Sequence, residues 1–151
     1  MTLQLTSSAF PAGVPIPVRH TCNGQDLSPP LNWSGVPAAA KSLALICEDP
    51  DAPGGTFYHW GLFDLPAELA SLAEGTLTPK GAMAARNDFG SAGYRGPCPP
   101  KGHGIHHYHF RLFALSVPHL TVPSSAGCKE LLAALRSHVL ASADLVGTFG
   151  R

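Results

Sequence analysis

Two short segments of this 151-residue chain gather the residue types that bind ions and move protons. In the first, Asp49 and Asp51 stand in the run Asp-Pro-Asp-Ala-Pro, and His59 follows shortly after. In the second, the run Gly-Pro-Cys-Pro-Pro at 96–100 precedes His106. A histidine N–H can donate to an anionic oxygen, and a carboxylate behind the ring fixes its orientation. The two segments therefore predict a pocket for a small anion, if the fold brings them together.

The loops that carry these residues are rich in proline and glycine. Proline fixes φ and stiffens a loop, which reduces the entropy lost when a ligand binds, and glycine lets the backbone approach that ligand closely. The carboxylates could also accept hydrogen bonds from an ammonium group. This extends the predicted ligands to a zwitterionic head group such as phosphoethanolamine.

Taken in order along the chain, these motifs resemble the phosphatidylethanolamine-binding protein family, in particular its bacterial branch of Raf-kinase-inhibitor-like proteins. The resemblance covers nearly the whole sequence. It is carried by Leu27–Trp33 (LSPPLNW), the D-P-D-A-P run, His59-Trp60, Arg86–Gly90 (RNDFG), Gly93-Tyr94, the G-P-x-P-P run, the G-x-H element and the H-x-Y element at His106.

The resemblance implies a mainly antiparallel, all-β fold: two packed sheets with a few small peripheral helices, forming one domain over residues 1–151. It also implies a pocket at one end that accepts phosphate-like or carboxylate anions, and a cis Ala52–Pro53 peptide bond. His107 stands where the family usually has an arginine, so a permanent cation with five donors is missing there. By motif, the implied site residues are Asp49, Asp51, His59, Gly96, Pro97 and His106, with Tyr94 and Tyr108 nearby.

Hydrophobic patterning predicts the strands that must position these residues. Alternation predicts a strand near Leu3–Ser7, and runs at 42–48 and 56–65 predict central strands. From Tyr108 to Leu115 the alternation puts Tyr108, Phe110, Leu112 and Ala114 on one face. One helix is expected on the sheet edge, capped by Ser124 or Ser125, with Leu131, Leu132, Leu135 and Val139 at helical spacing, before β-type residues return at 145–149.

Composition limits the classes of function. Charged residues are 13% of the chain, against about a quarter in typical soluble domains, while 16 glycines and 15 prolines favour strands and turns. Ten basic and ten acidic residues cancel, which argues against a nucleic-acid partner. The sequence shows neither a transmembrane segment nor a signal-like start, so we expect a cytoplasmic protein. The four scattered cysteines, without a C-x-x-C pair, are then interpreted as free thiols, with Cys98 beside the pocket.

Three alternatives stay open beside an anion-binding protein. The histidines at 103, 106, 107 and 109 invite a metal hypothesis, but His106 faces away from His107 and His109 on a strand, so neither a metal nor a cofactor is predicted. An Asp/His pocket would also suit a hydrolase or transferase, yet Ser91 lacks nucleophile-elbow spacing and a non-catalytic protein is favoured. The third is a regulatory inhibitor of a kinase or protease. Exposed edge strands also allow a homodimer.

Overall fold

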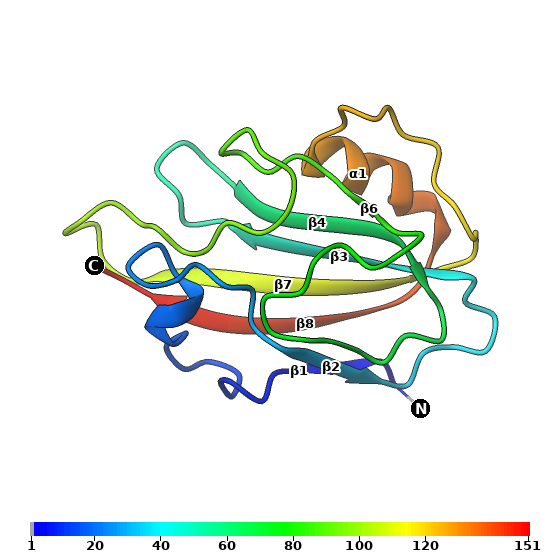
Figure 1. Ribbon diagram of the computed structural model, residues 1–151, viewed down its shortest axis with the longest axis horizontal. Coiled ribbons are helices and arrows are strands. Elements are labelled where there is room, and N and C mark those ends of the chain that lie inside the picture. Colours follow the sequence, from blue (N-terminus) through cyan, green and yellow to red (C-terminus); the bar gives the residue numbers. More distant parts are fainter. Residues whose placement is uncertain (1) are drawn as a thin grey trace.

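The computed structural model describes residues 2–151, which form two sheets that face one another (Figure 1). The smaller sheet has the order β1 (Gln4–Thr6), β2 (Leu31–Ser34), β5 (Ser71–Leu72). The larger has the order β6 (Met83–Ala84), β4 (Phe57–Pro66), β3 (Ser42–Asp49), β7 (His106–Leu115), β8 (Val139–Phe149). All neighbouring strands pair antiparallel. The predicted two-sheet, all-β fold is confirmed.

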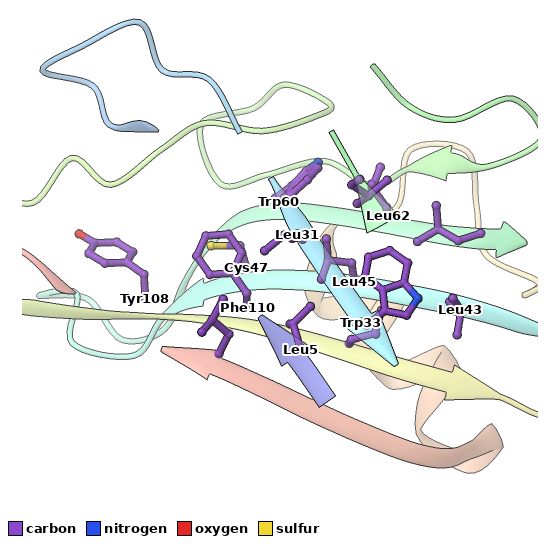
Figure 2. Close-up of a cluster of buried hydrophobic side chains, with 14 of the residues drawn as sticks. Leu5, Leu31, Trp33, Leu43, Leu45, Cys47, Trp60, Leu62, Tyr108 and Phe110 are labelled. Atoms are coloured by element: carbon purple, nitrogen blue, oxygen red, sulfur yellow. The ribbon is translucent and has the colours of Figure 1, made fainter. Parts of the chain in front are cut away.

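The main hydrophobic core lies between the two sheets. As the alternation predicted, Tyr108, Phe110 and Leu112 of β7 all point into it. From the smaller sheet, Leu5 and Trp33 close the core on the opposite side (Figure 2). Residues of both sheets are therefore withdrawn from water together, which stabilises the packing of one sheet on the other.

The helix α1 (Cys128–Leu135) covers the outer face of the larger sheet rather than its edge, so the predicted edge position was wrong. Its Leu131 belongs to a second apolar cluster with Ile46 of β3 and Phe113 of β7. The central strands carry apolar residues on both faces, and the outer face needs a cover. The helix lies so close that a Cβ built on Gly61 would be 2.8 Å from Cys128 Sγ.

The boundaries of α1 also differ from the prediction. The N-cap residue is Gly127, so neither Ser124 nor Ser125 caps the helix as predicted. The Gly127 N–H donates to Glu130 Oε1 at 3.3 Å. After α1 and the 3-10 helix η2 (Arg136–His138), Val139 begins β8, because it pairs with Leu115 rather than continuing the helix. A second 3-10 helix, η1, spans Val18–His20. None of the helices within residues 2–151 has the length and apolar character to cross a bilayer.

The interpretation of all four cysteines as free thiols was wrong for two of them. Cys22 and Cys98 form a disulfide, although they are 76 positions apart in the sequence. Their loops are also joined by a hydrogen bond from Cys22 N–H to the Pro97 carbonyl, at 3.1 Å. Cys47 and Cys128 are buried free thiols. Spacing could not reveal the bridge, because the pairing depends on which loops the fold brings together.

Candidate functional site

A cavity of about 210 Å³ opens at one end of the larger sheet. Three neighbouring strands meet there: Asp49 ends β3, His106 begins β7, and His59 lies near the start of β4. The volume is below the roughly 300–1,000 Å³ of drug-sized ligand pockets, so it suits a small ion or a head group. Its lining consists of Asp49, Ala52, Pro53, Phe57, His59, Phe89, Cys98, Pro99, Pro100, His106 and Tyr108.

Asp49 and His106 form a buried pair on the cavity wall. They are 3% and 1% exposed, and Asp49 Oδ2 lies 2.6 Å from His106 Nδ1. An ionised carboxylate only accepts, so the Nδ1–H of His106 donates and the ring orientation is fixed. Asp49 Oδ1 accepts the backbone N–H of Asp51 at 2.8 Å. The second ring nitrogen, His106 Nε2, lies 2.6 Å from Nδ1 of His103.

His59 reaches the cavity because β4 is irregular at this point. Cys47 pairs with Trp60 but Glu48 pairs with Tyr58, so His59 is the extra residue of a β-bulge. A bulge of this kind re-aims a side chain. The Nδ1–H of His59 donates to the Arg95 carbonyl at 2.7 Å, and burial lowers the pKa of the ring. His59 is therefore neutral near pH 7, with a lone pair on Nε2.

The Tyr108 hydroxyl is a buried polar group without a hydrogen-bond partner within the described part of the chain. Figure 2 shows it pointing away from the leucine and tryptophan side chains of the core. Burial raises the pKa of Tyr108 most strongly, and Asp49 raises it further through its charge and as an acceptor near the hydroxyl, so the hydroxyl keeps its proton. The two groups do not meet the geometry of a hydrogen bond. Buried polar groups are nearly always paired in native proteins, so the Tyr108 hydroxyl is an unused hydrogen-bonding position on the cavity wall.

Two phenylalanines make the remaining wall apolar. Phe57 and Phe89 meet edge to face with ring centroids 4.9 Å apart. The loop that carries Phe89 is tied to β4, because Asp88 Oδ2 accepts the Tyr58 N–H at 2.8 Å. The Arg95 guanidinium lies over the Phe89 ring, 4.8 Å from its centre. Neither phenylalanine was proposed from the sequence, although Phe89 belongs to the RNDFG motif of the resemblance and could have been included on that basis.

Asp51 lies outside the cavity lining. Its Oδ2 accepts both the backbone N–H and the ring Nδ1–H of His107, each at 2.8 Å. These hydrogen bonds lower the pKa of Asp51. The expected cis bond at Ala52–Pro53 was wrong: residues 2–151 contain no cis peptide, and the loop closes through a hydrogen bond from Gly55 N–H to the Ala52 carbonyl at 3.0 Å.

Tyr94, Gly96 and Pro97 also lie behind the cavity rather than on its wall. The Tyr94 hydroxyl donates to the His20 carbonyl at 2.6 Å, and Gly96 N–H donates to Asp26 Oδ1 at 2.8 Å. Gly96 passes so close to the His20 carbonyl that a Cβ would clash with it. These residues position the loop that supplies Cys98, Pro99 and Pro100 to the cavity.

The histidines of the 103–109 segment contact different partners. His107 pairs with Asp51, and His109 Nδ1 lies 3.0 Å from Asp144 Oδ2. Across residues 2–151, no three His, Cys, Asp or Glu side chains are grouped so that they could hold a metal ion. The geometry gives the metal hypothesis no support.

Comparisons with known proteins agree with this architecture. The sequence profile described as phosphatidylethanolamine-binding protein matches residues 6–150. A UPF0098 protein of Methanothermobacter thermautotrophicus is 44% identical, over 99% of this chain and 99% of its own length. A candidate lipoprotein of Mycobacterium tuberculosis, LppC, is 43% identical over 97% of this chain and 72% of its own length. The crystal structure of E. coli YbcL, described as a new member of the mammalian PEBP family, matches with a TM-score of 0.94 at 36% identity, over 100% of this chain and 99% of that one.

Proposed function

The chain belongs to the phosphatidylethanolamine-binding protein family, and on this premise we propose that its cavity binds a small phosphate-like or carboxylate anion, including the phosphoethanolamine head group. One observation carries the proposal. Within residues 2–151 the buried Tyr108 hydroxyl has no hydrogen-bond partner, and it lines the same small cavity as His59 and the Asp49–His106 pair. An oxygen of the ligand would complete its hydrogen bonding.

The charge of the cavity decides which anions fit. Its lining contains no lysine or arginine, and Asp49 contributes a negative charge. A dianion would therefore bind poorly unless a histidine takes up a proton. A singly charged phosphate ester or carboxylic acid fits better, because a protonated ligand oxygen can donate to the lone pair of His59 Nε2 while another accepts from Tyr108. An ammonium group on the ligand would offset the charge of Asp49, whose oxygens keep further acceptor capacity.

A binding role is favoured over catalysis by the chemistry of the lining. Among the residues that line the cavity, the sulfur of Cys98 is held in the disulfide, and no serine, threonine or lysine stands beside the histidines. A hydrolase or transferase would lack an activated nucleophile of these types. Inhibition of a kinase or protease would fit the same cavity, with a phosphorylated or acidic side chain of the partner bound in place of a small anion.

The cytoplasmic location expected from the sequence remains a prediction. Disulfides persist mainly in oxidising compartments, and the Cys22–Cys98 bridge therefore favours a location outside the reducing cytoplasm. Expression with and without export, followed by counting of free thiols, would test this point directly.

An NMR titration tests the proposed function. Phosphate, acetate, phosphoethanolamine and a phosphoserine peptide are added separately to ¹⁵N-labelled wild-type protein, to His59→Asn and to His119→Ala. Asparagine can still donate to the Arg95 carbonyl but lacks the second ring nitrogen, and His119 is an exposed control far from the cavity lining. We expect saturable shifts around β3, β4 and β7 in wild type and control, and weaker binding in His59→Asn. Shifts that are absent, or equal in all three proteins, would refute the proposal.

A further inference from the structure

His103 lies at the tip of an exposed loop between two glycines that adopt left-handed backbone conformations. Gly102 has φ of 77° and Gly104 has φ of 99°. Other residues rarely adopt such values, so this loop depends on glycine at both positions. Gly102 N–H donates to the Arg151 carbonyl at 2.8 Å, and His103 N–H donates to the Pro100 carbonyl at 3.1 Å. The loop therefore follows directly after Pro99 and Pro100, which line the cavity, and it lies beside the C-terminus (Figure 1).

The side chain of His103 reaches back from this loop to the cavity wall. Its Nδ1 lies 2.6 Å from His106 Nε2, and the two rings meet edge to face with centroids 4.9 Å apart. A neutral His106 that donates Nδ1–H to Asp49 has its lone pair on Nε2. His103 must then donate its Nδ1–H to that lone pair, which produces the hydrogen-bonded chain His103 to His106 to Asp49.

This chain leaves His106 without a free ring nitrogen, although its ring lines the cavity. A ligand oxygen can form a hydrogen bond with His106 only at Nε2, because Asp49 holds Nδ1 in a buried pair. The exposed His103 is the partner that can leave, since its loop contributes no strand pairing at that point. Water can then solvate the released ring of His103.

We propose that His103 is a displaceable internal partner of His106, and that the loop around it regulates the affinity of the cavity for anions. The inference rests on the proposed function and adds a regulatory residue to it. In the closed state His103 occupies His106 Nε2. In the open state a protonated ligand oxygen donates to the same lone pair, or a protonated Nε2 donates to the ligand.

The expected size of the effect follows from the closed population. The apparent dissociation constant equals the intrinsic one divided by the fraction of molecules that are open. One hydrogen bond of ordinary net strength would keep the open fraction at roughly a tenth to a third. Removal of His103 should therefore tighten binding by roughly three- to tenfold.

Calorimetric titration of inorganic phosphate into wild type, His103→Ala and His103→Phe tests the proposal, with His119→Ala as the surface-histidine control. The phenylalanine keeps a ring over the cavity wall but cannot form the hydrogen bond, so we expect both His103 variants to bind more tightly than wild type. The ¹⁵N shift of His106 Nε2, measured without phosphate, should move in both variants and stay unchanged in the control.

Three other results of the phosphate titration would refute the regulatory role, the displacement of His103 or anion binding itself. Equal or weaker phosphate binding by both His103 variants would refute the regulatory role alone. Tighter binding by His103→Ala but not by His103→Phe would show that the ring at position 103 blocks the cavity by its size rather than by its hydrogen bond to His106. That result would refute the proposed displacement. Phosphate binding by none of the proteins would refute the proposed function and this inference together, even if the His106 shift confirmed the contact.

Discussion

The disulfide between Cys22 and Cys98 fastens a wall of the cavity to the segment that follows η1. Cys98 lines the cavity between two prolines, whereas Cys22 lies outside the lining, and their Cα atoms are 5.4 Å apart. The bridge therefore supports the cavity from outside its lining, because it holds the loop at 96–100 against the segment that contains Cys22.

Reduction of this bridge should weaken both the fold and the cavity. A cross-link across 76 positions restricts the unfolded chain, and loss of such a native disulfide typically costs about 2–5 kcal/mol. We expect a reductant to lower the urea midpoint of the wild type and to weaken phosphate binding. The Cys22→Ser/Cys98→Ser double variant should start at the lower midpoint and not respond to reductant. A wild-type midpoint that does not respond, with the bridge shown to be reduced by thiol counting, would contradict the expectation.

Asp49 and Asp51 should respond differently to the same substitution. In the wild type the Asp51 N–H and the His106 Nδ1–H donate to different oxygens of Asp49. In Asp49→Asn an NH2 group, which cannot accept, replaces one of these oxygens, and a buried donor left unpaired costs about 1–3 kcal/mol. Asp51 is exposed and its partner His107 is exposed, so Asp51→Asn should change the free energy of unfolding by less than about 1 kcal/mol. It should also leave the phosphate dissociation constant within about twofold, because only Asp49 lines the cavity. Equal losses of stability in urea denaturation would contradict this assignment.

Acidification should destabilise the protein through two buried histidines. Burial lowers the pKa of His20 and of His59, while in the unfolded chain both titrate near 6.5. As the pH falls below about 6.5, the unfolded state binds protons that the folded state does not, so the free energy of unfolding decreases. Each histidine contributes a slope of at most about 1.4 kcal/mol per pH unit, until the pH reaches its folded pKa.

The variant His20→Asn tests this pH dependence. Asparagine can replace the donation from His20 Nδ1 to the Leu27 carbonyl, 2.9 Å in the wild type, but it does not titrate. We expect a smaller loss of stability between pH 7 and pH 5.5 than in wild type, measured by urea denaturation. The exposed-site variant His119→Ala should keep the wild-type slope. Identical slopes in His20→Asn and wild type would exclude His20 as a contributor.

Patterning predicted the sheets well because each strand's burial is visible in the sequence, as alternation in the first part of β7 and as a continuous apolar run in β3, which is buried at every position. The alternation along β7 placed Tyr108, Phe110, Leu112 and Ala114 on the core face, and the apolar run at 42–48 became a central strand. The helix was predicted less well, since Val139 has helical spacing but pairs with Leu115 in the sheet. At Val139, long-range strand pairing determines the structure and outweighs the local helical spacing.

The site could be predicted from the sequence only for residues whose side chains themselves suggest anion binding, the aspartates and histidines of the two motifs. Asp49, His59 and His106 were named from the sequence, and the structure brings them to one cavity. The contacts of His103 and Cys22 could not be anticipated, because both depend on how glycine- and proline-rich loops fold back in three dimensions. Spacing along a strand predicts which side chains share a face of the sheet, whereas the path of a loop depends on tertiary contacts that the local sequence does not reveal.

Tyr108→Phe should separate the stability of the fold from the affinity of the site. No group in the described part of the chain, residues 2–151, forms a hydrogen bond with this buried hydroxyl, and a polar group buried in this way costs about 1–3 kcal/mol. Removal of the oxygen keeps the ring in the core and should leave the free energy of unfolding unchanged or raise it by about 1 kcal/mol. The same change would remove the hydrogen bond that we propose between this hydroxyl and the ligand, so phosphate should bind roughly three- to tenfold more weakly.

The control for this prediction is Tyr94→Phe. The Tyr94 hydroxyl donates to the His20 carbonyl at 2.6 Å and lies outside the cavity lining, so its loss should cost about 1 kcal/mol of stability and leave phosphate binding nearly unchanged. The two substitutions remove the same atom from the same residue type, and opposite results are expected because only one hydroxyl is already paired. If Tyr108→Phe destabilised the free protein as much as Tyr94→Phe does, the Tyr108 hydroxyl would have a partner without the ligand, and its role in anion binding would lose its physical basis.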